Sequence, residues 1–222
     1  MVMQTKTNEF FQKVYTWMFL GLLISGLTSY FVSSSESALN FIFSNIIIFY
    51  GLIVLELALV IILVSAIKKM SPNFAKWMFF VYSFINGITL SAIFLIYTQS
   101  SIVVVFFITA GMFGLLSLYG FFTDRDLTSI GRILFFGLIG IILASLVNIF
   151  IKSVVFDLTL AVLAIVIFTG LIAYDTQKLK KFSESARNKT EISKVAIIGA
   201  LSLYLDFINL FLNLLRMFGQ RK

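Results

Sequence analysis

Long apolar runs separated by short polar segments are the dominant pattern along the chain. An α-helix needs about 20 apolar residues to cross the hydrocarbon core of a bilayer. The uncharged run from Trp77 to Thr123 would make one helix of about 70 Å, so we expect two spans joined at residues 98–101 (TQSS). The pattern therefore predicts seven membrane-spanning helices, at about residues 14–32, 39–67, 77–97, 102–122, 133–151, 158–177 and 195–216.

The composition agrees with this interpretation. Of the 222 residues, 60% are hydrophobic and 12% are charged, and the mean hydropathy is +1.04. A soluble domain has roughly 25% charged residues. We therefore expect an all-α integral membrane protein, with a single transmembrane domain over residues 1–222. The seven helices should form a bundle with the C-terminal helix at its centre.

The last apolar run has polar residues on only one of its faces. Each residue of an α-helix advances by about 100°, and one arc of about 100° then contains Gly199, Ser202, Asp206, Asn209, Asn213 and Arg216. The rest of the circumference is mostly Leu, Ile, Phe, Val and Ala. We expect this polar stripe to face a cavity or partner side chains inside the bundle, because ionisable groups at membrane depth are costly and usually functional.

Glu56 is another charged residue within an apolar run, and together with Arg216 it suggests an ion pair. A lone glutamate in hydrocarbon must be protonated or paired, and an arginine does not readily lose its proton. A Glu56–Arg216 pair between the second and last helices would satisfy both. In the alternative, Arg216 extends to the membrane interface and Glu56 stays neutral.

Asp175 and Asp206 are the candidate proton sensor. If the two carboxyl groups approach within hydrogen-bond distance, they share one proton and titrate as a unit. The carboxylates would also serve as transient calcium ligands, although two are too few for a tight site. In the alternative, Asp175 is a solvated interfacial residue paired with Lys178 or Lys180.

The charge distribution predicts orientation rather than nucleic-acid binding. The net charge is +7, but the basic residues lie in short segments between apolar runs. Most of the 17 Lys and Arg residues fall on the inner side if the N-terminus is cytoplasmic. The first run is too long for a cleaved signal peptide. Because the chain has no cysteine and no histidine, we expect no disulfide, no Cys/His metal site and no cofactor.

Three stretches resemble the Bax inhibitor-1 (transmembrane Bax inhibitor motif) family, and in particular its bacterial members: residues 111–150, 170–179 and 200–216. The resemblance implies a seven-helix protein with a central last helix that acts as a pH-sensitive calcium leak channel. It also implies that Asp175 and Asp206 are the family's paired aspartates. Glu56 and Arg216 match a latch pair between helices two and seven. Some members of the family bind and restrain a membrane protease.

Two functions therefore compete. The first is a calcium leak channel gated by the aspartate pair, in which calcium ions pass along a carboxylate-lined path. The second is a non-transporting interaction protein that modulates a membrane protease or a stress-response complex. Buried charges are expensive for a scaffold, which favours the channel. We expect no enzymatic activity, and a multi-pass protein of the bacterial plasma (inner) membrane.

Overall fold

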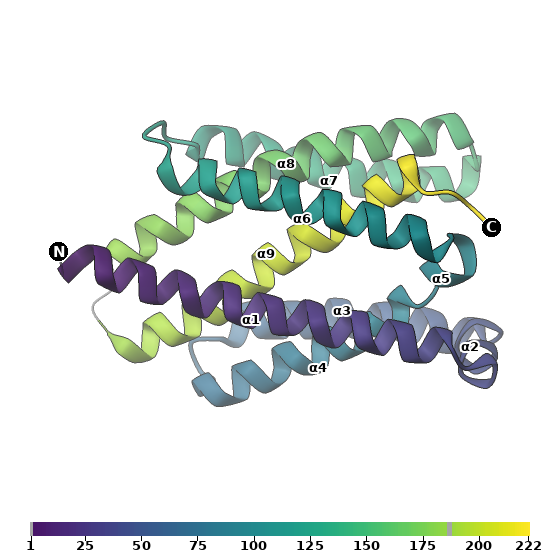
Figure 1. Cartoon of the computed structure of the whole chain (residues 1–222), viewed down its shortest axis with the longest axis horizontal. Coiled ribbons are helices and arrows are strands. Elements are labelled where there is room, and N and C mark those ends of the chain that lie inside the picture. The colour runs from purple at the N-terminus through teal and green to yellow at the C-terminus, as the bar shows by residue number, and fades with distance from the viewer. Residues whose placement is uncertain (1, 186–187) are drawn as a thin grey trace. The chain divides into compact units, whose positions relative to one another are not determined.

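The computed structural model describes residues 2–185 and 188–222, most of which are helical (Figure 1). The helices are α1 (Val2–Ser33), α2 (Glu36–Phe43), α3 (Ile46–Ala66), α4 (Pro72–Leu90), α5 (Ile93–Ile96), α6 (Gln99–Phe122), α7 (Thr128–Ile151), α8 (Val154–Ser185) and α9 (Lys189–Phe218).

Within residues 2–185 and 188–222, seven helical segments are long and apolar enough to cross a membrane, which confirms the predicted helical membrane bundle. They are Lys6–Ser33, Ile46–Ala66, Pro72–Ile96, Gln99–Phe122, Thr128–Ile151, Val154–Ser185 and Thr190–Phe218. The last is the most buried: 67% of its most apolar stretch lies inside the protein, against 39% or less for the others. The C-terminal helix is therefore more enclosed by protein than the other candidate spans of the described residues.

The predicted second span, residues 39–67, is wrong at its N-terminal end. The chain breaks at Ser44 and Asn45, so that α2 and α3 are separate helices. The Asn45 side chain accepts hydrogen bonds from the backbone N–H groups of Ile47 and Ile48, which caps α3. Hydrophobicity continues across this break, so the apolar pattern alone does not reveal it.

The predicted connection at residues 178–194 is mostly helical. α8 continues through the Lys-rich segment to Ser185, and α9 begins at Lys189, while residues 186–187 lie outside the described ranges. Lysine and glutamate are favourable helix residues, and no proline ends α8 near Gln177. The first helix likewise begins at Val2 rather than near residue 14.

The chain divides into two compact units that interleave in the sequence. Unit 1 comprises Met1–Ile96, Ser183–Tyr204 and Lys222, and unit 2 comprises Tyr97–Phe182 and Leu205–Arg221. The first half of α9 therefore belongs to unit 1, and its second half belongs to unit 2.

In unit 1, α4 packs against α1 and α3. Glycines allow the close approach of α1 and α4. A methyl group on Gly87 would lie 2.7 Å from the carbonyl oxygen of Ser25, and one on Gly21 would lie 2.6 Å from the ring of Phe79. Small residues of this kind let membrane helices approach until their backbones touch.

In unit 2, α8 packs against α6 and α7 through two more glycines. Gly120 of α6 lies against the backbone of Ala173, and Gly131 of α7 lies against the ring of Tyr174. Aromatic rings join α6 to the second half of α9, because Phe113 lies edge-on to Phe207 with the ring centroids 5.7 Å apart. These contacts fix the helices that carry the polar stripe and Asp175.

Candidate functional site

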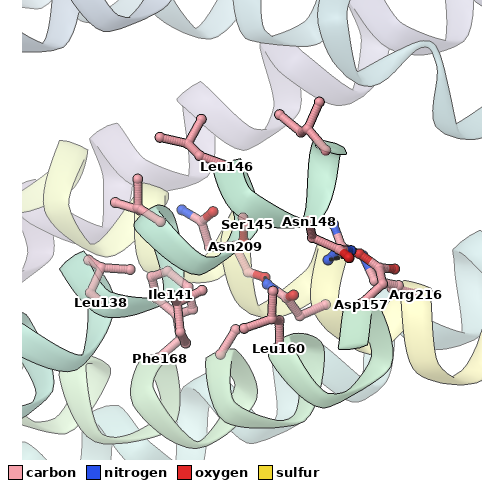
Figure 2. Close-up of a pocket in the computed structure, with 14 residues that line it drawn as sticks. Leu138, Ile141, Ser145, Leu146, Asn148, Asp157, Leu160, Phe168, Asn209 and Arg216 are labelled. Atoms are coloured by element: carbon pink, nitrogen blue, oxygen red, sulfur yellow. Dashed lines mark hydrogen bonds and ion pairs between the residues drawn. The ribbon is translucent and has the colours of Figure 1, made fainter. Parts of the chain in front are cut away.

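A cavity of about 500 Å³ lies in unit 2 among α7, α8 and α9 (Figure 2). Asn209, Asn213 and Arg216 of the polar stripe lie on its wall. These positions are separated by four and three residues, so they share one face of α9.

The cavity has a polar end and an apolar end. Figure 2 shows Asp157, Arg216 and Asn148 close together at one end, and Leu138, Ile141 and Phe168 at the other. The complete lining is Leu138, Ile141, Ile142, Ser145, Leu146, Asn148, Ile149, Asp157, Leu160, Ala164, Phe168, Asn209, Asn213 and Arg216.

An ion pair forms the polar end. Nη1 of Arg216 lies 3.3 Å from Oδ1 of Asp157, and the two side chains are 38% and 39% exposed. Asp157 lies between the predicted spans 133–151 and 158–177, where it has no predicted role. Its position in the first turn of a helix was the signal that would have identified it, because an acidic residue there is stabilised by the helix dipole.

The two asparagines of the stripe direct their amide groups in the same way. Nδ2 of Asn209 donates to the carbonyl of Leu205, and Nδ2 of Asn213 donates to the carbonyl of Asn209, each over 2.8 Å. Each carboxamide nitrogen thus donates to a carbonyl of its own helix, and each carboxamide oxygen remains an acceptor. Amide oxygens are ligands that hard cations accept.

Asp206 lies one turn before Asn209 and is 6% exposed. Among the described residues, no donor lies within hydrogen-bond distance of its Oδ2 atom. Asp175 of α8 is half-buried, and its charge acts on the Asp206 carboxyl group, so the two groups lie within electrostatic range. The structure thus brings both predicted sensor residues into one region of unit 2.

The C-terminal part of α8, just after Asp175, is attached to the loop between α6 and α7. Oε1 of Gln177 accepts from the backbone N–H of Leu127 over 2.9 Å, and its Nε2 donates to the carbonyl of Arg125 over 2.7 Å. Nζ of Lys180 donates to the carbonyl of Phe121. This role of Gln177 was not predicted from the sequence.

An exposed ion pair extends the same attachment. Nζ of Lys181 lies 2.6 Å from Oδ1 of Asp126, which also accepts from the hydroxyl and the backbone N–H of Thr128. These donors, Lys181 foremost, hold the pKa of Asp126 well below its usual range.

Glu56 lies in unit 1 and is half-buried on α3. Its carboxylate accepts from Nδ2 of Asn86 over 3.1 Å and from the hydroxyl of Thr89. The predicted partner, Arg216, forms its ion pair with Asp157 instead. Each residue thus has a partner within its own unit. A Glu56–Arg216 latch would join the two units, and it stays a prediction.

Two further predictions concern Ser202 and calcium coordination. Ser202 of the stripe is half-buried on the half of α9 that belongs to unit 1. Over residues 2–185 and 188–222, no group of three or more His, Cys, Asp or Glu side chains is placed to hold a metal ion. Transient calcium coordination by Asp175 and Asp206 stays a prediction.

Comparison with known proteins identifies the family to which this chain belongs. Residues 7–222 match the family described as "Inhibitor of apoptosis-promoting Bax1". Inner membrane protein YbhL of Escherichia coli K12 is 46% identical over 97% of this chain and 93% of its own length. A Borreliella burgdorferi protein is 47% identical over the same shares, and a Streptococcus pyogenes membrane protein is 37% identical over 96% and 93%. The chain therefore belongs to the Bax inhibitor-1-like family of multi-pass membrane proteins.

Proposed function

We propose that the protein is a pH-sensitive calcium leak channel of the bacterial plasma membrane. One observation carries the proposal. The buried Asp206 carboxyl group lies within electrostatic range of Asp175, on the helix face that continues into the cavity wall at Asn209 and Asn213. A carboxyl group at membrane depth is costly and is explained by a functional role.

The chemistry of this face suits a calcium ion. Carboxylate and carboxamide oxygens are the ligands that calcium prefers, and 6–8 of them are usual in a tight site. The stripe offers fewer, spaced along α9 by single helical turns. Conduction needs sites that are favourable enough to enter and weak enough to leave. A series of weak oxygen sites therefore fits a passing ion better than a stored one.

The aspartate pair provides the pH dependence. With one shared proton the pair has a single negative charge, and a hydrogen bond between the carboxyl groups holds α8 and α9 together. Loss of that proton leaves two negatively charged carboxylates that repel each other. Gain of a second proton removes the negative charge that attracts a cation. Either change biases an equilibrium between closed and open states.

Calcium flux into proteoliposomes tests the proposal. Purified full-length protein is reconstituted with a calcium-sensitive dye inside, and calcium is added outside over a series of pH values. We expect calcium entry above that of protein-free liposomes, with a rate that changes with pH. A rate equal to the protein-free control at every pH would overturn the channel and favour the non-transporting interaction protein.

The proposed orientation, with a cytoplasmic N-terminus, has its own test. The chain has no cysteine, so one introduced thiol reports one position. In intact bacteria, a membrane-impermeant maleimide should label Ser37→Cys, between the first two spans, but not Asp124→Cys, between α6 and α7. Both sites are exposed. The reverse labelling pattern would invert the topology without affecting the channel proposal.

A further inference from the structure

A buried chain of hydrogen bonds crosses unit 1. Nδ2 of Asn86 lies 3.1 Å from Oε2 of Glu56, and the Tyr204 hydroxyl lies 2.7 Å from Oδ1 of Asn86. Oγ of Ser25 lies 2.6 Å from the Tyr204 hydroxyl and 2.7 Å from the carbonyl oxygen of Ser83. Asn86, Tyr204 and Ser25 are 8%, 0% and 1% exposed, so these groups are shielded from bulk water. These hydrogen bonds link α3, α4, α9 and α1.

Counting hydrogens shows what happens when Glu56 is a carboxylate. Asn86 donates to Glu56, so its oxygen accepts from Tyr204, and Tyr204 must then accept from Ser25. The single hydroxyl hydrogen of Ser25 is now used. Its oxygen still lies 2.7 Å from the Ser83 carbonyl oxygen and 3.0 Å from the Gly21 carbonyl oxygen, and no hydrogen stands in either contact. This state therefore leaves the short Ser25–Ser83 contact without a hydrogen bond.

A proton on Glu56 reverses the direction of every hydrogen bond from Glu56 to Ser25. Oε2–H of Glu56 donates to the Asn86 oxygen once the carboxamide has turned over. The Asn86 nitrogen then donates to Tyr204, Tyr204 donates to Ser25, and Ser25 donates to Ser83. One proton is added at Glu56 and none leaves. Each contact from Glu56 through Asn86, Tyr204 and Ser25 to Ser83 now contains one hydrogen, while the longer contact of Ser25 with the Gly21 carbonyl, 3.0 Å, has none of its own. The oxygen and nitrogen of a carboxamide are nearly equal in shape, so the same atomic positions serve both states.

We propose that Glu56 is a proton-binding site, and that its proton reverses a hydrogen-bond relay through Asn86 and Tyr204 to Ser25. Tyr204 lies two residues before Asp206 on α9, so the relay passes through the helix that holds the polar stripe. The relay concerns proton binding alone and holds whether or not the protein conducts calcium.

The groups around Glu56 agree with a site that accepts a proton. The Thr89 hydroxyl donates to its other oxygen and also lies 3.3 Å from the Ile85 carbonyl, so it has an alternative acceptor. The titratable groups that feel the charge of Glu56 are the phenol groups of Tyr82 on α4 and Tyr204 on α9, which are neutral at ordinary pH. Within the described residues of unit 1, Glu56 forms no ion pair with a lysine or arginine. Helix α2, which also packs against α3, has its Glu36 exposed.

Infrared difference spectroscopy between alkaline and acidic pH tests the relay. The sample is the full-length protein in lipid. On acidification, we expect a carboxylic-acid C=O band together with a change in a tyrosine ring mode. Glu56→Gln should lose its component of the C=O band and the tyrosine change with it. Tyr204→Phe should lose the tyrosine change alone.

Two variants test the coupling itself. Asn86→Ala interrupts the chain between Glu56 and Tyr204, so the C=O component should stay while the tyrosine change is lost. Ser25→Ala removes the far end and should shift the tyrosine change without removing the C=O component, which decides the question if Asn86→Ala does not fold.

Tyr82→Phe is the matched control. Its ring lies edge-on to Tyr204 at 5.8 Å but outside the chain, so both signals should persist. A Glu56→Gln spectrum equal to wild type, or a tyrosine change unaltered in the two relay variants, would overturn the proposal.

Discussion

The guanidinium group of Arg216 and the carboxylate of Asp157 join the last turn of α9 to the first turn of α8 across 3.3 Å. Each charge also lies at the helix end where the backbone dipole favours it, with the acid at an N-terminus and the base at a C-terminus. The pair lines the polar end of the cavity. It is therefore both a helix contact and a charged group beside the proposed ion path.

A double-mutant cycle should detect this pair as a small coupling. Because more than a third of each side chain is exposed, solvent screens the interaction. We expect a coupling of about 0.2–1 kcal/mol between Asp157→Asn and Arg216→Gln in the free energy of unfolding, measured in detergent micelles. Strictly additive losses would show that the two charges act independently.

Glycine positions on α6 should separate close packing from open surface. A methyl group on Gly120 would collide with the backbone of Ala173, whereas one on Gly114 meets no atom within 4 Å. We expect Gly120→Ala to lower the free energy of unfolding by about 1–3 kcal/mol, the usual cost of overpacking. Gly114→Ala on the same helix should be neutral or slightly stabilising, because alanine is the better helix former. Equal effects at the two positions would contradict the α6–α8 contact.

The Asp126–Lys181 pair should make stability depend on acid. The folded state lowers the pKa of Asp126 below its unfolded value of about 3.9. The resulting stabilisation is therefore complete above about pH 4, and it is lost as the pH falls toward the folded-state pKa. The thermal midpoint of Asp126→Asn should lie below that of wild type at pH 7, and the gap should narrow under acid and in high salt.

Asp124→Asn is the control for this experiment, because Asp124 is exposed in the same loop. It should show no such pH-dependent gap. A gap for Asp126→Asn that stays constant from neutral pH into acid would assign the effect to something other than the charge of Asp126.

The lengths of the apolar runs were sufficient to predict the seven candidate spans found in residues 2–185 and 188–222, although not the start of the second. Helical spacing was sufficient to place Asn209, Asn213 and Arg216 on one face of α9. The apolar pattern failed where a side chain, rather than hydrophobicity, determines the backbone. Asn45 starts a new helix inside an apolar run because its oxygen caps two backbone N–H groups. Conversely, the charged segment after Gln177 stays helical, because charge alone does not end a helix.

The candidate site was predictable where an unusual residue type marked it. Asp206 and Arg216 are conspicuous in an apolar span, whereas Asn86, Tyr204 and Ser25 are ordinary residues of membrane helices. Their importance lies in contacts between residues far apart in the sequence, such as Ser25 and Tyr204. One sequence has no direct record of such contacts. For the same reason Asp157 was missed as the partner of Arg216.

The aspartate pair leads to the last prediction. Asp206 is buried, and the charge of Asp175 acts on it, so the protonation of one carboxyl group depends on the other. Replacing either by asparagine removes one titrating group and leaves a neutral side chain of nearly the same shape. We therefore expect Asp206→Asn, and separately Asp175→Asn, to flatten the pH dependence of calcium flux in proteoliposomes. Neither variant should unfold the protein, which its thermal midpoint would verify. The exposed Asp124→Asn should keep the wild-type profile. If both pair variants also keep that profile, the proton sensor lies elsewhere, and Glu56 becomes the next residue to test.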